Sequence, residues 1–401
     1  MNTHHRKYVQ NAADMSCLED QSVDLVVTSP PYPMIGMWDA CFIRQSPQVH
    51  SALADHDGWK AFDLMHGVLD AVWDEVCRVL KPGRFACINI GDAVRKTGDE
   101  FGLFTNHSRI ISAMVQRGMT PLPSIIWRKQ TNAPNKFMGS GMLPAGAYVT
   151  LEHEHILVFR KGGKRTFETD DARRARRESA VFWEERNHWY SDIWFDLKGA
   201  RQQLSENQAR KRSGAFPFEL PYRLVNMYSI AGDTVLDPFA GSGTTMIAAM
   251  ASARNSISLE IENGLDSLVL DNGGAFVEFA NRRLQARIDG HLAFVDERLQ
   301  SGKPLKYINS YYGFPVMTRQ ETDLFFPALE AVHAHAGNCF TVKYDTSAEA
   351  RRLAQTGVGC ETPLSVNRPA EEPAPASDKP VKPDKPVKPS KPLRHNLKLF
   401  E

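Results

Sequence analysis

The chain has 401 residues, of which 42% are hydrophobic and 24% are charged, so it is long enough for about two or three domains. Its net charge is only +1, which excludes a uniformly basic nucleic-acid binder and requires any such surface to be local. The polar N-terminus lacks the apolar segment of a secretory signal, and no apolar run is long enough for a membrane span. Six cysteines without CxxC spacing favour a reduced, cytoplasmic protein over a zinc ribbon.

Apolar β-type segments alternate with helical segments along the chain, which predicts an α/β fold with a largely parallel sheet. The longest helical pattern is followed by Lys81-Pro82-Gly83, a sequence that ends helices. Two of the strands are expected to pair antiparallel around a Gly/Pro-rich loop at 132–148. The predicted strands are 22–29, 84–92, 124–129, 154–161 and 256–262, and the predicted helices are 61–80, 107–118 and 276–288. A strand, a glycine loop and a small-residue helix are predicted within 234–253.

The sequence Thr-Ser-Pro-Pro-Tyr, residues 28–32, directly follows the first predicted strand. Three interpretations are open: a solvated turn, a polyproline II ligand for another protein, or a catalytic loop. The apolar flanking strand disfavours an exposed ligand. Pro30 and Pro31 fix the backbone and remove two N–H donors, so carbonyl oxygens are free to accept other hydrogen bonds. Acceptors beside the ring of Tyr32 suit a planar base with an exocyclic amino group.

A second motif begins where a predicted strand ends at Asp237 and continues through Gly241 and Gly243 into a helix that starts at Thr244. Glycines let a ligand approach the backbone, and a helix N-terminus presents free N–H groups. Glu260, at the end of the next predicted strand, can accept hydrogen bonds from both hydroxyls of a ribose. Alone, the motif fits a tight strand-to-helix turn equally well. No lysine precedes the helix, which favours a nucleoside cofactor without a polyphosphate.

Together the two motifs, TSPPY at 28–32 and DPFAGSGTT at 237–245, resemble those of the S-adenosylmethionine-dependent amino-methyltransferases of DNA. Flanking segments are similar too, so the resemblance covers most of residues 10–285. The catalytic motif precedes the cofactor motif, as in the β group of this family. The resemblance implies a Rossmann-like α/β fold with a mostly parallel sheet, an antiparallel hairpin and a small target-recognition region.

This resemblance also implies a division of the chain. The expected parts are a catalytic half at 1–159, a basic and aromatic target-recognition region at 160–215, a cofactor-binding half at 216–289, a C-terminal extension of unknown role at 290–360, and a disordered Lys/Pro-rich tail at 361–401. The implied cofactor is S-adenosylmethionine, with its ribose held by the acid at 260. Residues 10 and 11 match the family's adenine contact. The residues expected to bind the cofactor are Asn11, Asp237, Phe239, Gly241, Gly243, Thr244, Thr245 and Glu260.

The expected catalytic residues are Ser29, Pro30, Pro31 and Tyr32. The hydroxyl of Ser29 and the carbonyl of Pro30 would accept the two amine hydrogens, while Tyr32 stacks on a base extruded from the duplex. Serine before the two prolines resembles the cytosine-N4 enzymes more than the adenine-N6 enzymes, which stay as the alternative. An alternative of another class is a catalytically inactive DNA-binding subunit on the same fold, which the intact motifs disfavour.

Between the two motifs lies a run of cations followed by three tryptophans. Such a run alone is more often a solvated face, but this position favours contact with DNA phosphates. The tryptophans fit either that surface or the core of a small domain. The expected DNA-binding residues are Arg160, Lys161, Lys164, Arg165, Arg173, Arg174, Arg176 and Arg177.

His153 and His155 share one face of a predicted strand, but the sequence offers no third ligand, and no metal is expected. The expected partners are double-stranded DNA and, as a candidate, a cognate restriction endonuclease that acts on the same site. No membrane partner is expected. Neither the recognition sequence nor the oligomeric state is encoded in a readable motif.

Overall fold

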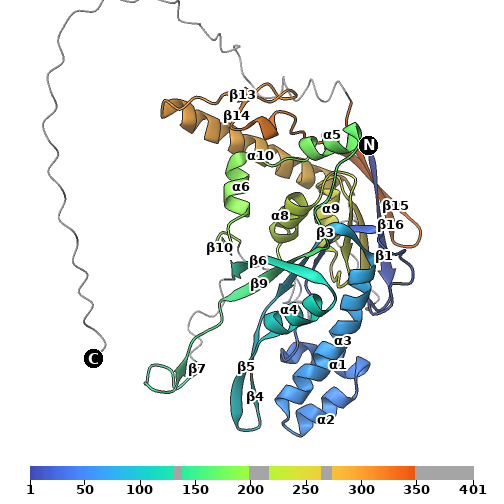
Figure 1. Cartoon of the computed structure of the whole chain (residues 1–401), viewed down its shortest axis with the longest axis vertical. Coiled ribbons are helices and arrows are strands. Elements are labelled where there is room, and N and C mark those ends of the chain that lie inside the picture. Colours follow the sequence, from blue (N-terminus) through green and yellow to red (C-terminus); the bar gives the residue numbers. More distant parts are fainter. Residues whose placement is uncertain (130–137, 198–215, 263–272, 348–401) are drawn as a thin grey trace, which may run out of the picture. The chain divides into compact units, whose positions relative to one another are not determined.

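A computed structural model describes residues 1–129, 138–197, 216–262 and 273–347, and all of its elements lie within residues 1–358 (Figure 1). Its centre is a ten-stranded sheet with the order β10-β6-β9-β3-β2-β11-β12-β1-β16-β15. The strands of this sheet are β1 Asn2–Val9, β2 Val23–Thr28, β3 Leu80–Ile90, β6 Met119–Arg128, β9 His153–Lys161, β10 Ile193–Trp194, β11 Thr234–Asp237, β12 Asn255–Glu260, β15 Ala328–His335 and β16 Cys339–Asp345. Three two-stranded sheets comprise β4 Ala93–Thr97 with β5 Glu100–Phe104, β7 Met138–Gly139 with β8 Ala147–Tyr148, and β13 Tyr307–Ile308 with β14 Pro315–Val316.

Five central strands, β3, β2, β11, β12 and β1, run parallel to one another. Strand β9 lies antiparallel between β3 and β6, and β16 and β15 continue the other side of the sheet in antiparallel pairing. The mostly parallel, Rossmann-like α/β fold predicted from the sequence is confirmed. The predicted antiparallel pairing of 124–129 with 154–161 is confirmed as well, as part of the β6–β9 ladder.

Helices cover both faces of the sheet in the view of Figure 1. No helix among the described residues is long and apolar enough to span a membrane. The helices are α1 Asp39–Gln45, α2 Gln48–Ala54, α3 Gly58–Val79, α4 Asn106–Gln116, α5 Asp170–Glu178, α6 Trp183–Trp189, α8 Glu219–Tyr228, α9 Thr244–Met250 and α10 Gly273–Gln300, with short 3₁₀ helices η1 Gly36–Trp38 and η2 Arg319–Glu321.

Helices α1 to α4 and one face of the sheet form the first core. The apolar residues of α3 recur at helical spacing, so Met65, Leu69 and Val76 are all buried against the strands. Asp57 caps this helix by accepting the backbone N–H of Lys60 at 3.0 Å. The helix ends at Val79, directly before the predicted stop, because the next residue is extended and opens β3.

The second core lies on the opposite face, beneath α8, α9 and α10. Trp189 and Trp194 belong to it, with only 3% and 1% of their surface exposed. The indole of Trp194 donates to the carbonyl of Trp189 at 3.0 Å, and the indole of Trp127 donates to the carbonyl of Leu197 at 2.9 Å. Trp189 and Trp194 of the predicted recognition region are therefore core residues, and the indole N–H of Trp194 is satisfied.

Residues after 289, for which the sequence predicts no element, extend this fold. Helix α10 continues to Gln300, and β15 and β16 pair as a hairpin that covers the edge of β1. A third, smaller core joins α10 to the residues around β13 and β14, with Phe182, Tyr312 and Phe314 at its centre. The predicted tail at 361–401 lies outside the described residues.

We predict that Arg165→Met lowers the free energy of unfolding by about 3 kcal/mol. The Arg165 guanidinium donates to both carboxylate oxygens of Asp233, at 2.6 and 3.0 Å, and only 7% of the Asp233 side chain is exposed. The variant leaves this carboxylate buried without its cation. Urea unfolding measures the loss.

Arg173→Ala is the matched control, because Arg173 pairs with Asp170 on the exposed surface of α5. It should change the free energy of unfolding by less than about 0.5 kcal/mol. An equally small change for both variants would contradict a structural role for Arg165.

Candidate active site

The two sequence motifs meet because β2 and β11 are neighbouring parallel strands. Leu25 pairs with Val235 and Val26 with Leu236, so both strands end at the same edge of the sheet. The hydroxyl of Thr28 donates to Asp237 Oδ1 at 2.6 Å and thereby joins the ends of the two strands. Open α/β sheets bind their ligands at this carboxyl edge.

Asp237 is a buried acid that organises the turn after β11. Its Oδ1 also accepts the backbone N–H of Phe239 at 3.1 Å, and the hydroxyls of Thr28 and Thr245 bond to the carboxylate. Burial raises the pKa of Asp237 to about 6, and the nearby charge of Glu260 acts in the same direction, although these hydrogen bonds oppose the shift. The carboxylate therefore changes its charge near neutral pH.

The glycine loop has free space beside its backbone, and a hydrogen bond to Glu260 holds it in place. Gly243 caps α9 with φ +80°, and Gly241 has φ +50°, both conformations that favour glycine. A methyl group placed on Gly241 would meet no atom within 4 Å, so a ligand has room beside the backbone. Glu260 accepts the backbone N–H of Gly241 at 2.8 Å and that of Glu262 at 3.1 Å. Each carboxylate oxygen keeps lone pairs for ribose hydroxyls, so this loop fits a nucleoside cofactor.

The end of β1 lies beside this loop, as the predicted adenine contact requires. The backbone N–H of Gln10 donates to the carbonyl of Glu260 at 3.0 Å. The Asn11 side chain accepts the backbone N–H of Ala13 and donates to Gln45 of α1, both at 3.0 Å. Its contact with adenine stays a prediction.

On the catalytic side, the phenol of Tyr32 is the centre of a hydrogen-bond network. It donates to Glu154 Oε2 at 2.9 Å and accepts from Asn89 Nδ2 at 2.9 Å. Asn89 also donates to Glu154 at 2.7 Å, and Lys129 pairs with the other carboxylate oxygen at 2.8 Å. Burial, followed by the charge of Glu154, raises the pKa of Tyr32 well above its usual value. The phenol therefore keeps its proton at neutral pH.

This network determines the direction of the bond between Ser29 and Tyr32, whose oxygens lie 3.1 Å apart. A phenol has one hydrogen, and that hydrogen is directed to Glu154. Ser29 must then be the donor to Tyr32, which leaves the lone pairs of the Ser29 oxygen available. The arrangement presents an acceptor at the end of β2, beside an aromatic ring.

Asn89, Lys129 and Glu154 are the residues of this site that sequence reasoning missed. A signal existed in part, because Asn89 is the one polar residue in the buried end of β3, residues 86–90. Its Oδ1 is also a buried acceptor that lacks a partner among the described residues. A methyl group on Gly91 would approach Tyr32 Cε2 to 3.0 Å, so the absence of a side chain there lets the ring lie against the end of β3.

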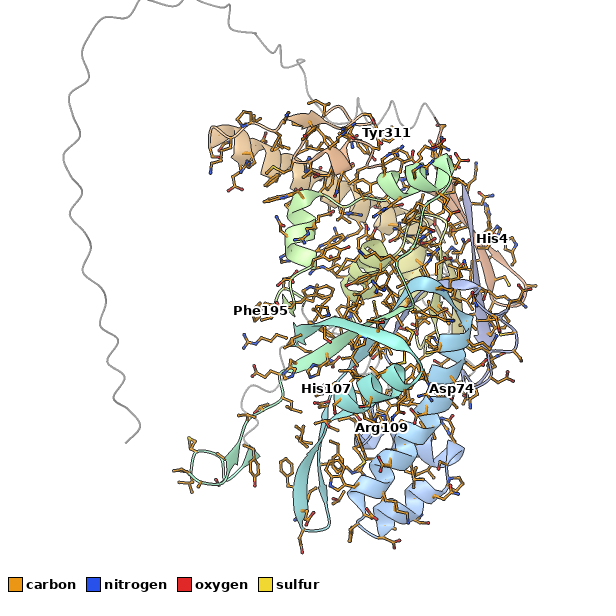
Figure 2. The ribbon with its side chains drawn as sticks, in the orientation of Figure 1. His4, Asp74, His107, Arg109, Phe195 and Tyr311 are labelled. Atoms are coloured by element: carbon orange, nitrogen blue, oxygen red, sulfur yellow. The ribbon has the colours of Figure 1, made fainter. Side chains whose placement is uncertain are left out.

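One of the two strand histidines, His155, lies in a cluster with Asp92 and His107 that the sequence could not indicate. Asp92 Oδ2 lies 2.7 Å from Nδ1 of His107, which Figure 2 labels on α4, and 4.0 Å from Nε2 of His155. The rings of His107 and His155 stack with centroids 4.1 Å apart and planes 21° from parallel. Asp92, His107 and His155 each offer one ligand atom, and these atoms lie within 4.8 Å of one another, so the structure brings together a third ligand that the sequence did not show. Since Asp92 also accepts the backbone N–H of His107, we interpret the cluster as a cap of α4 and assign no metal.

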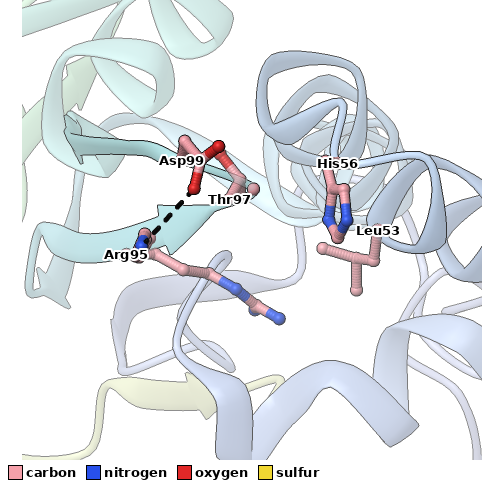
Figure 3. A pocket seen from close by; sticks show the side chains of 7 residues that line it. Leu53, His56, Arg95, Thr97 and Asp99 are labelled. Carbon is pink, nitrogen blue, oxygen red and sulfur yellow. Dashed lines mark ion pairs between the residues drawn. The ribbon is translucent and has the colours of Figure 1, made fainter.

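A separate hollow lies between the β4–β5 hairpin and α2 (Figure 3). Arg95 at its wall donates to both oxygens of Asp39 at 2.8 Å, and Lys96 pairs with Asp99 at 3.8 Å. The described lining contains no residue of the two motifs. The lining residues are Leu53, His56, Arg95, Lys96, Thr97, Gly98 and Asp99.

The predicted DNA-binding cations are not gathered at this site. Figure 1 shows α5 at the opposite end of the sheet from β4, β5 and β7, and Arg165 pairs with Asp233 at the amino end of β11. Lys161 donates to the carbonyls of Cys77 and Leu80, at 2.5 and 2.7 Å, which ties it to the end of α3. The α5 arginines form ion pairs with Asp170, Asp171 and Asp323, or lie over the ring of Phe167. Their contact with DNA stays a prediction.

Known proteins are similar to this chain in sequence and structure. A family described as DNA methylase, which groups N6 and N4 methyltransferases, matches residues 23–268. The chain is 52% identical over 330 residues to the Type II methyltransferase M.MthZI of Methanothermobacter thermautotrophicus, covering 82% of this chain and 92% of the relative. It is 44% identical over 300 residues to the Type II methyltransferase M.MjaI of Methanocaldococcus jannaschii, covering 70% and 97%.

A Thermus thermophilus protein crystallised with S-adenosyl-L-methionine is similar as well, with 30% identity and a TM-score of 0.49 over 71% of this chain and 95% of that one. The chain belongs to the DNA methylase family. It is a DNA methyltransferase, and its cofactor is S-adenosylmethionine.

We predict that Glu154→Ala slows methyl transfer about 100-fold without changing cofactor affinity. Tyr32 would lose the acceptor that holds its phenol, and small displacements in an active site cost about this much. Methyl incorporation into DNA measures the rate, and calorimetry measures cofactor binding. Glu152→Ala is the control, because Glu152 lies two residues away and pairs only with exposed Arg128 among the described residues. Equal rates for both variants would exclude a positioning role for Glu154.

We also predict a pH-dependent stability difference between the protein and Asp237→Asn. Folding raises the pKa of Asp237 from 3.8 to about 6, so the folded state holds this proton more tightly than the unfolded state does. The contribution of Asp237 to stability is therefore largest at low pH and is lost as pH rises through 6.

Relative to the Asn variant, the unmutated protein should lose about 2 kcal/mol of unfolding free energy between pH 4 and pH 7. Urea unfolding without cofactor at several pH values measures this difference. Asp99→Asn, at an exposed position, is the control. A constant difference between the protein and Asp237→Asn across this range would refute the prediction.

Proposed function

We propose that the enzyme methylates the exocyclic N4 amine of cytosine in double-stranded DNA after flipping the base out of the helix. The observation that carries the proposal is the free acceptor on Ser29, beside the ring of Tyr32, at the edge that also bears the cofactor loop. A flipped cytosine presents both a ring to stack and an amine to donate.

The amine of cytosine is a poor nucleophile because its lone pair is conjugated with the ring. The Ser29 oxygen and the Pro30 carbonyl would accept its two hydrogens, which favours a pyramidal nitrogen and directs the lone pair away from the ring. S-adenosylmethionine, when bound, supplies a methyl group made electrophilic by its sulfonium. Asp237, Phe239 and the start of α9 would hold the methionine part, and Glu260 the ribose.

After transfer the nitrogen must lose one proton, and the network around Tyr32 offers a route for it. Hydrogen bonds run from Ser29 through the Tyr32 phenol to Glu154, over 3.1 and 2.9 Å. In this proposal Ser29 receives the amine proton as it passes its own proton to Tyr32, and Tyr32 passes its proton to the carboxylate. Lys129 stabilises the carboxylate before the transfer.

The adenine-N6 amine is the alternative target, since the family includes both activities. Ser29 favours cytosine over adenine, because the motif of the adenine-N6 enzymes resembles this one but has an Asp or Asn at that position. An inactive DNA-binding subunit is the alternative of another class, and the intact network of Ser29, Tyr32 and Glu154 argues against it.

We further propose a restriction–modification context, because two relatives are named Type II methyltransferases. A cognate endonuclease that cuts the same sequence is then the expected partner. The exposed arginines of α5 are retained as proposed contacts to DNA phosphates away from the flipped base.

We predict that Ser29→Ala lowers the methyl-transfer rate by about 100-fold or more, because the amine loses one preorganised acceptor. Ser22→Ala, directly before the start of β2, should leave the rate unchanged. Labelled methyl groups are transferred to unmethylated genomic DNA, and calorimetry should show equal cofactor binding by both variants.

Nucleoside analysis of the same DNA identifies the product base, and sequencing of the methylated DNA identifies the site. N4-methylcytosine is expected. N6-methyladenine would overturn the choice of base, and an unchanged rate in Ser29→Ala would overturn the role of the hydroxyl.

A further inference from the structure

The connection between β6 and β9 begins and ends at the catalytic network. Strand β6 ends at Arg128 and β9 begins at His153, while the adjoining Lys129 and Glu154 support Tyr32. Between them, β7 and β8 form a short hairpin, which stands apart from the rest of the sheet beside β4 and β5 in Figure 1. This hairpin therefore lies at the edge where a flipped base must enter.

The tip of the hairpin is a defined turn. The backbone N–H of Ser140 donates to the carbonyl of Gly146 at 2.9 Å, and the hydroxyl of Ser140 donates to the carbonyl of Leu143 at 2.5 Å. The backbone N–H of Leu143 donates back to the carbonyl of Ser140 at 3.2 Å. Such bonds hold residues 141–145 in one conformation without a core beneath them.

This turn presents apolar side chains to water. Met142 is 85% exposed and Leu143 is 69% exposed, and Val149 at the base of the hairpin is 84% exposed. Adjacent exposed apolar residues at a tip are unfavourable in water unless a partner covers them. Methionine and leucine are among the side chains that proteins insert between DNA base steps.

A second hairpin braces the first. The ring of Tyr148 in β8 stacks on the ring of Phe101 in β5, with centroids 5.1 Å apart and planes 15° from parallel. The β4–β5 hairpin starts at Ala93, three residues after the end of β3, so it arises from the same edge. Because this stack joins the two hairpins, it limits the movement of the hairpin that carries the tip.

Exposed cations also lie on the neighbouring elements, Arg128 at the end of β6 and Lys96 in β4. Arg128 and Lys96 are 51% and 63% exposed, and their partners, Glu152 and Asp99, lie at 3.2 and 3.8 Å. Exposed ion pairs of this kind contribute about 0–1 kcal/mol, so both cations can exchange their partners for phosphates at little cost. Exposed apolar residues suit stacked bases, and exposed cations on neighbouring elements suit the phosphate backbones on either side.

We propose that Met142 and Leu143 form a wedge that enters the DNA duplex and fills the gap left by the flipped base. The inference rests on the proposed function, since it requires that a base leaves the stack. Extruding a base exposes the faces of its neighbours, and an inserted apolar group covers them. The same β6–β9 connection carries both the wedge and, at its two ends, Lys129 and Glu154 of the network around Tyr32.

The test compares the full chain with Met142→Ser/Leu143→Ser on a duplex bearing the site that the unmutated protein methylates. A 2-aminopurine placed beside the target base reports unstacking by its fluorescence. The unmutated protein should raise this fluorescence, and the double variant should not. At saturating DNA, the variant should methylate about tenfold more slowly or worse, with unchanged cofactor affinity.

Removing the base opposite the target lowers the cost of flipping, so this duplex should restore most of the rate to the variant. Leu299→Ser, which alters an exposed apolar residue on α10, is the control and should behave as the unmutated protein. Normal fluorescence and rate in the double variant would overturn the wedge. Weaker DNA binding with normal flipping at saturation would overturn it too, in favour of a simple docking surface.

A change in self-association alone, measured by sedimentation, would overturn the inference in favour of contact with a second copy of the chain. If the unmutated protein methylates no DNA at all, it is the proposed function that fails. The two failures are therefore distinguishable.

Discussion

The parallel pairing of β2 with β11 is the constraint on which the site depends. More than 200 residues separate the two motifs in the sequence, yet Thr28 and Asp237 are joined by one hydrogen bond of 2.6 Å. Because both strands run the same way, their carboxyl ends present the Pro-Pro-Tyr turn and the glycine loop side by side. A cofactor on one loop and a base on the other then approach each other without any movement of the sheet.

This edge carries destabilising features that the rest of the fold compensates. Asp237 is buried with a raised pKa, the phenol of Tyr32 is kept from ionising, and Asn89 retains a buried acceptor without a partner among the described residues. Two large apolar cores on the two faces of the sheet stabilise the strands that bear these groups. Perturbed groups of this kind cluster where proteins do chemistry, because charge and hydrogen-bond capacity are kept for a substrate.

Local patterns in the sequence predicted the helices and strands that bury apolar residues, and the turn that depends on glycine. Helix α3, the β6–β9 pairing and the strand-loop-helix around Gly241 and Gly243 follow from periodicity and turn chemistry. The support of Tyr32 could not be predicted, since Asn89 lies in β3, Lys129 directly after β6 and Glu154 in β9, and the order of these strands in the sheet has no local signature. Composition also left one choice open: Trp189 and Trp194 fitted either a DNA-contact surface or a core in the sequence, and tertiary packing places them in a core.

The direction of the central strands also indicates which edge of the sheet would face DNA. In the proposed function, a base at Tyr32 would come from a duplex placed over the carboxyl edge, whereas Arg165 and Lys161 are bonded to residues at the other end of the central strands. The exposed groups at the carboxyl edge include two hairpins joined by the stack of Phe101 and Tyr148, and cations in exposed ion pairs. With a net charge of only +1, affinity for phosphates cannot come from the chain as a whole. In the proposed function, recognition near the flipped base would then depend more on shape and on apolar contact than on dense positive charge.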